Sequence, residues 1–155
     1  GFYEYMRARG LSARGQVLSV KRTAASPAAA KALRLPAQTP ITRISMVRFA
    51  NEAPVACGVF EGQHELVERL LALDVETEDA MTLLETRLGH RLEAIHIETS
   101  ALPAKATEAR LLQVPVATPL LRIDFVPHDI EGQPLLFAAM HFRADRFSYR
   151  AVIRR

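Results

Sequence analysis

The sequence predicts an α+β fold, in which an antiparallel sheet of about six strands carries flanking helices and consists of two pseudo-repeated halves. Three observations lead to this prediction. The 155-residue chain repeats itself at an offset of 79 residues. Each copy alternates short helical segments with segments of alternating hydrophobicity. Short polar turns join neighbouring strand segments, and such close connections require antiparallel pairing rather than a parallel, doubly wound sheet.

The internal repeat rests on identical residues 79 positions apart. Segment 26–44 matches segment 105–123, and the match extends over about sixty residues in each copy. The identical pairs are Ala30/Ala109, Leu33/Leu112, Pro36/Pro115, Thr39/Thr118, Pro40/Pro119, Arg43/Arg122, Ile44/Ile123 and Val47/Val126. Each half is too small to bury its sheet face alone, so we expect both to share one continuous sheet. The seam between them is a natural place for a pocket.

Each copy begins with the same three elements. A short helix ends at a glycine, Gly10 or Gly89, because glycine most readily takes the left-handed backbone that follows a last helical turn. An alternating strand is expected next, over 16–24 or 92–100. An alanine-rich helix follows and ends at a proline; in the first copy, Ser26 is expected to cap it.

Each copy then continues into a hairpin. Strands are expected over 41–50 and 120–128, each starting after a Thr-Pro pair. Short polar turns lead from them into strands 54–61 and 134–142.

Two further segments, 64–73 and 147–154, lie outside this repeat pattern. Residues 64–73 show helical spacing of leucines. Within the second copy, residues 78–88 predict the helix before Gly89, with acidic residues at its positive end. Residues 147–154 alternate and predict a last strand. The totals are six to seven strands and four to five helices.

Composition and motifs exclude several classes of function. The single cysteine, Cys57, excludes an internal disulfide and a cysteine-based zinc site, and the five histidines lack metal-ligand spacing. No apolar run reaches about eighteen residues, the length of a membrane span. Phosphate-binding glycine loops, nucleophile elbows and paired strand carboxylates are also missing. We therefore expect no catalytic residue, no cofactor, no metal ion and no membrane partner.

The net charge of +3 conceals basic ends around an acidic middle. Such ends either bind an anionic partner or form solvated faces whose long stems cover apolar surface. Aromatic residues do not alternate with the basic ones, as binding of single-stranded nucleic acid requires. Direct nucleic-acid binding by these residues is therefore the weaker interpretation.

Four arginines in predicted strands are the main candidates for ligand binding. An unpaired buried guanidinium is costly, so each of these arginines needs an anionic partner. Arg122 has Asp124 as a candidate partner and Arg143 has Asp145. For Arg48, a carboxylate or phosphate ligand and a protein carboxylate are equally open as partners. The fourth arginine, Arg43, is the repeat equivalent of Arg122.

Five segments in order carry a family resemblance. They are Phe2–Met6 with Arg9-Gly10, Ala32–Leu35 with Thr39–Ile41, Val47–Val55, Gly132–Pro134 and Phe142–Phe147. Together they resemble the UTRA domain, the effector-binding half of HutC-subfamily regulators in the GntR family of transcriptional regulators. Each motif is weak alone, but five at the right spacing are specific and cover essentially the whole chain.

The resemblance implies a chorismate lyase-like fold with internal pseudo-symmetry, in agreement with the repeat. It also implies one ligand-sensing domain over 1–155, with the N-terminal winged helix-turn-helix DNA-binding domain absent from this chain. DNA would be contacted only through that missing domain. A cytoplasmic repressor or activator that works as a homodimer is the expected context.

Departures from the family pattern suggest the ligand. Where sugar-phosphate-sensing relatives carry two arginines, this chain has Met46 and Arg48. Gly58 and Leu136 replace two expected acids, and Phe142 replaces an expected tyrosine. The resemblance thus implies a pocket for a small anionic or carboxylate metabolite, such as an organic or fatty acid. Arg48 would hold the anionic group, Met46, Leu136 and Phe142 would line the apolar part, and Gly58 would leave room.

Two alternatives share the expected fold. One is a chorismate lyase-like enzyme, but Leu136 and the apolar run around it leave the carboxylate that this chemistry needs unsupplied. The other is a dimerisation module whose pocket is vestigial.

Overall fold

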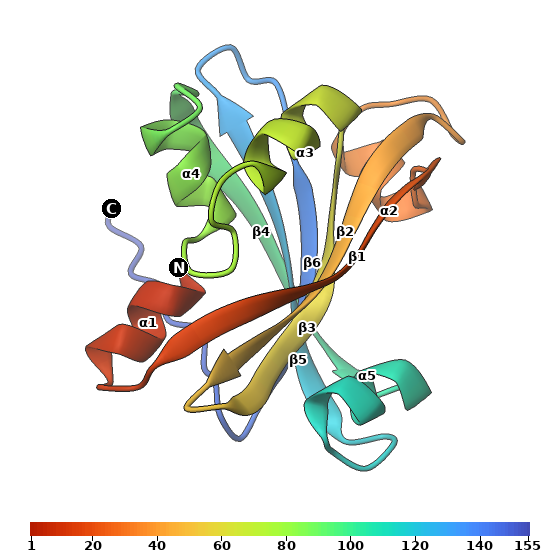
Figure 1. The fold of residues 1–155 in the computed structure, drawn as a ribbon. Helices are drawn as coiled ribbons and strands as arrows, with labels where there is room; N and C mark the ends of the chain where they lie inside the picture. The colour runs from red at the N-terminus through yellow and green to blue at the C-terminus, as the bar shows by residue number, and fades with distance from the viewer.

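The computed structural model describes residues 1–155, which form a six-stranded antiparallel sheet and five helices (Figure 1). The strands are β1 (Ala13–Ala24), β2 (Pro40–Ala50), β3 (Ala53–Gly62), β4 (Leu92–Pro103), β5 (Pro119–Asp129) and β6 (Phe137–Arg143). The helices are α1 (Phe2–Ala8), α2 (Pro27–Ala32), α3 (His64–Leu71), α4 (Ala80–Thr86) and α5 (Ala106–Leu112). This confirms the predicted α+β class and the antiparallel sheet.

The sheet joins two equivalent halves. Its strand order is β1-β2-β3-β6-β5-β4, so the first half contributes three neighbouring strands and the second half contributes the other three in reverse order. The halves meet where β3 pairs with β6, with Ala56 opposite Phe142 and Glu61 opposite Phe137. The prediction of one continuous sheet shared by two repeats is therefore confirmed.

The repeat extends to the ends of the strands and to the turns before them. Strands β1 and β4 begin and end 79 residues apart, and so do β2 and β5. Thr39 donates its hydroxyl to the carbonyl oxygen of the proline three residues earlier over 2.6 Å, and Thr118 does the same over 2.7 Å. The repeated threonine thus closes the turn just before the first hairpin strand of each half.

One face of the sheet carries α1, α3 and α4, and the other face carries α2 and α5 (Figure 1). The main core lies on the first face. Met6 of α1, Val67 of α3 and Leu83 of α4 are buried there with Met46 and Met140 of the sheet. Burial of these apolar side chains provides most of the driving force for folding.

On the opposite face, each half covers the other. Helix α5 of the second half packs its Leu112 with Val47 and Cys57 of the first half. Helix α2 of the first half packs its Ala29 with Val126 of the second half. Because each helix needs strands of the other repeat, neither half has a complete core of its own.

The predicted strand over 147–154 was wrong. A turn at residues 144–146 follows β6, and the chain beyond it forms no regular structure. Strand β6 already has β3 and β5 on its two sides, so a strand that follows directly has no free edge beside it. Val152 and Ile153 are accordingly 85% and 89% exposed.

Two smaller findings complete the fold. The predicted strand 134–142 is shorter at its start, because β6 begins at Phe137 and Pro134 forms only an isolated bridge with His128. Proline lacks the N–H that pairing in the sheet needs, which explains why β6 begins only after Pro134.

None of the five helices combines the length and the apolar character that a membrane crossing requires.

Candidate functional site

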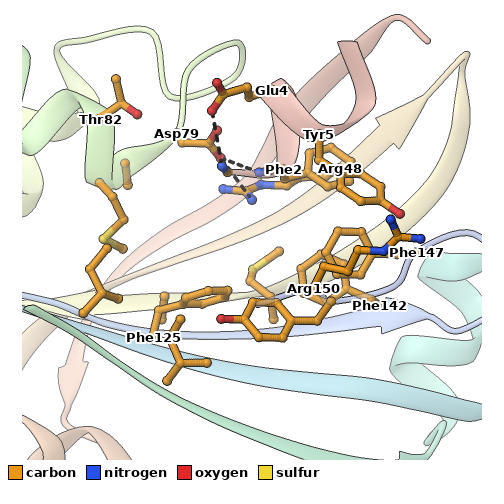
Figure 2. Close-up of a pocket in the computed structure, with 18 of the residues that line it drawn as sticks. Phe2, Glu4, Tyr5, Arg48, Asp79, Thr82, Phe125, Phe142, Phe147 and Arg150 are labelled. Carbon is orange, nitrogen blue, oxygen red and sulfur yellow. Dashed lines mark hydrogen bonds and ion pairs between the residues drawn. The ribbon is translucent and has the colours of Figure 1, made fainter. Parts of the chain in front are cut away.

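A cavity of about 490 Å³ lies between the sheet and α1, α4 and the chain that follows β6 (Figure 2). Fourteen of its 21 lining residues are hydrophobic. Phe125, Met140 and Phe142 line it from β5 and β6, and Ile95 and Ile97 line it from the edge strand β4. A cavity of this size with an apolar lining is typical of a site for a small organic molecule.

The irregular chain after β6 forms part of the cavity wall. The Phe147 ring stacks on Phe142, with ring centres 4.1 Å apart, and contacts Tyr5 of α1 at 4.9 Å. The Tyr5 hydroxyl is 3.3 Å from the hydroxyl of Ser148. The segment predicted as a strand therefore packs against α1 and lines the cavity instead.

Arg48 supplies a positive charge at one end of this apolar cavity. Its side chain reaches from β2 and is 8% exposed. One terminal nitrogen, Nη1, lies 3.6 Å from Oδ1 of Asp79, and Nε is buried without a hydrogen-bond partner. The guanidinium carbon is 5.4, 5.0 and 5.7 Å from the ring centres of Phe2, Tyr3 and Phe60, respectively. Aromatic faces stabilise the cation but supply no hydrogen-bond acceptor.

Asp79 links the cavity to two helices. It is the residue just before α4, and its Oδ1 also accepts a hydrogen bond of 3.2 Å from the backbone N–H of Phe2 at the start of α1. Figure 2 shows the contacts of Asp79 with Arg48 and with Phe2 as dashed lines. Asp79 therefore contacts β2 and α1 through its carboxylate and continues into α4 through its backbone.

Tyr3 lies beside Arg48 as a neutral phenol. Its hydroxyl donates a 3.1 Å hydrogen bond to the carbonyl oxygen of Val75. Burial raises the pKa of Tyr3 above its usual range, although the nearby Arg48 charge opposes this effect. The ring therefore packs against Arg48 without providing a negative charge.

The other strand arginines have protein partners. Arg122 donates from Nε to Asp124 over 2.7 Å, and Arg143 donates from Nη2 to Asp145 over 2.8 Å, so both predicted ion pairs are confirmed. Arg43 donates over 3.1 Å to the buried carboxylate of Glu61. Arg48 is the one member of this group that makes no hydrogen bond.

The structure brings only some of the expected site residues together. Arg48 and Phe142 line the main cavity, while Met46 lines a gap of about 10 Å³ beside Arg48 and Phe60. A side chain at Gly58 would meet Met140, with Cβ 2.8 Å from its Cα, so no ligand space opens there. Leu136 is fully buried in the main core and lies outside the cavity wall.

Sequence reasoning placed no site residue on α1, at Asp79 or at Phe147. In the sequence, Asp79 is one of the acidic residues at the start of the predicted helix 78–88, a position that usually reflects the helix dipole. The aromatic residues at 2, 3 and 5 could have indicated that α1 packs against the site, because a solvent-exposed helix of seven residues rarely carries three aromatic rings.

A family model and a curated protein both match the sequence of this chain. The family model described as the UTRA domain matches residues 8–148. The protein "HTH-type transcriptional regulator Rv0792c" of Mycobacterium tuberculosis is 30% identical over 89 residues, which are 57% of this chain and 33% of that protein. The chain thus matches only about a third of the length of that curated relative.

Solved structures show the same fold. The effector domain of PhnF from Mycobacterium smegmatis superposes with a TM-score of 0.84 at 19% identity and covers 100% of this chain and 95% of that one. The ligand-binding domain of a putative GntR-family transcriptional regulator from Bordetella bronchiseptica gives 0.77 at 20% identity, over 92% and 89% of the two chains. At these identities the likeness establishes the architecture.

Proposed function

The chain belongs to the UTRA domain family, the effector-binding domains of GntR-family transcriptional regulators, and from this premise we propose that its effector occupies the cavity beside Arg48. The observation that carries the proposal is a buried guanidinium without a hydrogen bond at one end of an apolar cavity. A carboxylate or phosphate group satisfies such a guanidinium better than a single loose ion pair does.

The effector that fits this site combines one anionic group with an apolar body, as an organic or fatty acid does. Arg48 would bind the anionic group, and Phe142, Phe125 and Met140 would contact the apolar part. Met46 would support the site indirectly, because it packs beside the Arg48 side chain and does not line the cavity. The proposed site does not include Gly58, where β3 and β6 are in close contact, or Leu136, which lies in the main core.

We further propose that the domain works inside a HutC-type repressor in the cytoplasm, as a homodimer whose DNA contacts are made outside these 155 residues. Signalling requires the ligand to bind two arrangements of the regulator with different affinities. A second copy is supported by β4, an edge strand whose Ile95 and Ile97 are about 40% exposed. Exposed apolar edge strands commonly pair with another chain.

A catalytic role is not part of this proposal. The expected carboxylate of a chorismate lyase-like site has no counterpart at Leu136, just before β6, or at Phe137–Met140 within it, because these residues are apolar. The carboxylate nearest to Arg48 is Asp79, and it is engaged by Arg48 and by the Phe2 N–H.

Thermal unfolding with a panel of small anions tests the proposed function. The panel contains aliphatic carboxylates of increasing length, aromatic carboxylates, phosphonates and sugar phosphates. A ligand at a hundredfold its Kd adds about 2.7 kcal/mol of stability, which shifts the melting temperature measurably. We expect apolar carboxylates to stabilise the domain, whereas stabilisation by sugar phosphates alone would contradict the apolar-ligand proposal.

Two arginine variants make this test specific. Arg48→Met keeps an unbranched apolar stem but removes the guanidinium and its donors, so the shift should disappear. Arg122→Met removes a guanidinium that has its own partner, Asp124, and should leave the ligand-induced shift unchanged. An equal shift in Arg48→Met would contradict the role of Arg48. No shift with any compound would favour a dimerisation module with a vestigial pocket.

A further inference from the structure

We propose that Asp79 is a built-in competitor of the effector, and that binding transfers Arg48 from Asp79 to the anionic group of the ligand. The inference rests on the proposed function, because it concerns the same cavity. It assigns to Asp79 a role in setting both the affinity for anions and the connection between the cavity and α1.

The first step is that Arg48 is held weakly. The 3.6 Å separation between its Nη1 and the Asp79 carboxylate exceeds hydrogen-bond length, and Nε has no partner. A guanidinium has five N–H donors in a planar fork that fits a carboxylate with two parallel bonds. A ligand carboxylate that made both bonds would therefore be a stronger partner than Asp79 is in this geometry.

The second step is that Arg48 cannot serve both carboxylates equally well. Asp79 is only 14% exposed, and a ligand anion on the same guanidinium would lie within a few ångströms of it. Two negative charges at such a distance in a poorly solvated site repel each other strongly. Binding must therefore lengthen the Arg48–Asp79 contact, and the Asp79 charge lowers the affinity for every anionic ligand.

The third step is that Asp79 cannot move alone. Its carboxylate accepts the Phe2 N–H at the start of α1, and its backbone continues directly into α4. Arg7 of α1 also donates a hydrogen bond to the carbonyl oxygen of Thr77, two residues earlier. Displacement of Asp79 from Arg48 is therefore expected to move α1 and the start of α4 together, relative to β2.

Replacement of the charge tests this proposal. Asp79→Asn keeps the size of the side chain and an oxygen that accepts the Phe2 N–H, but removes the repulsion. We expect the variant to bind straight-chain carboxylates of four to twelve carbons on the order of tenfold more tightly than the wild type, by calorimetry. Alcohols of the same lengths should bind both proteins equally. Asp74→Asn, which alters a carboxylate of the same loop bonded to Thr77, should change neither affinity.

A second measurement records how fast the backbone amides of α1 exchange hydrogen with solvent. In the wild type, a saturating carboxylate should speed hydrogen exchange of the α1 amides, whereas the alcohol should not.

The outcomes separate this inference from the proposed function. If the wild type binds carboxylates and Asp79→Asn binds them equally or more weakly, Asp79 only positions Arg48; the inference then fails and the proposed function stands. An equal gain for alcohols would also overturn the inference, because charge would not be the cause. If neither protein binds any carboxylate, both proposals fail.

Discussion

Gly58 shows at the residue scale how closely β3 and β6 approach each other at the centre of the sheet. A Cβ atom at this position would lie 2.7 Å from Sδ and 2.8 Å from Cα of Met140. The methionine tail is flexible, but its Cα belongs to a central strand. We expect Gly58→Ala to lower the free energy of unfolding by about 1–3 kcal/mol, as overpacking in a core does. Urea unfolding measures this loss, and an unchanged midpoint would show that the two strands separate freely.

Cys57, the neighbour of Gly58, is expected to be chemically inert in the folded domain. Burial raises the pKa of its thiol to about 12, and the charge of Glu108 acts in the same direction. Only the thiolate reacts with alkylating agents, so labelling at pH 8 should be slow in buffer and fast in urea. Because the pKa is raised, this group costs no stability below its ordinary value of 9.0; stability falls as the pH rises from there toward 12. Rapid labelling of the folded protein would contradict this prediction.

Strand arginines illustrate which contacts a sequence predicts. Arg122 and Asp124 are two residues apart in a strand, so their side chains share a face, and the pair could be predicted. Asp79 precedes a helix and contacts Arg48 only through the tertiary fold, so no local spacing in the sequence predicts this contact. Leu136 was expected in the pocket but lies just before β6 begins, where the alternation of faces does not yet hold.

At the scale of elements, Ser26 distinguishes two otherwise equivalent helices. Its hydroxyl oxygen accepts the Ala29 N–H at the start of α2, and the hydroxyl donates to the buried carboxylate of Glu61 over 2.6 Å. The second copy has Lys105 at the equivalent position, and α5 has no side-chain cap. Ser26→Ala should therefore cost about 1–2 kcal/mol, since it removes a cap and leaves Glu61 with fewer donors.

Lys105→Ala is the matched control for the cap, because it alters the equivalent position of α5 without removing a capping hydrogen bond. It should leave the free energy of unfolding within about 0.5 kcal/mol of the wild type, as most surface substitutions do. Urea unfolding of both variants decides the point. Equal losses would mean that the Ser26–Glu61 network contributes nothing beyond the helix propensity of the substituted residue.

The helices and strands of the repeat could be predicted because their signals are local. Prolines, glycines and threonines mark the ends of the elements in both copies. The segment after β6 shows the limit of such signals. Its alternating pattern resembles that of a strand, but its Phe147 stacks on Phe142, and sheet topology leaves the segment no edge. Strand formation depends on a partner, which periodicity alone does not reveal.

At the scale of the whole molecule, the repeat explains why the two halves cannot be separated. Helix α5 covers strands of the first half, and α2 covers strands of the second. This exchange was not predicted from the sequence, because the identical residues define equivalent elements but not the strands on which each helix packs.

The two edges of the shared sheet differ, although they belong to equivalent strands. On β1, the Gly15 N–H donates to the carbonyl oxygen of Glu76, so the loop before α4 covers part of that edge. Apart from its ladder with β5, β4 makes no backbone hydrogen bond. Its Ile97 is 40% exposed and lines the cavity, and Leu18, 79 residues earlier on β1, is 42% exposed.

If the proposed homodimer forms through β4, these two positions should respond differently to charge. Ile97→Lys places a cation on the free edge, where lysine opposes strand pairing, and should shift the domain from dimer to monomer in sedimentation velocity. Leu18→Lys makes the same change at similar exposure on the other edge, at the register shift of β1, and should leave the dimer intact. Dissociation by Leu18→Lys alone would place the interface on β1. A wild-type domain that sediments as a monomer at all concentrations would contradict self-association, and it would leave Ile95 and Ile97 exposed only as the open side of the cavity.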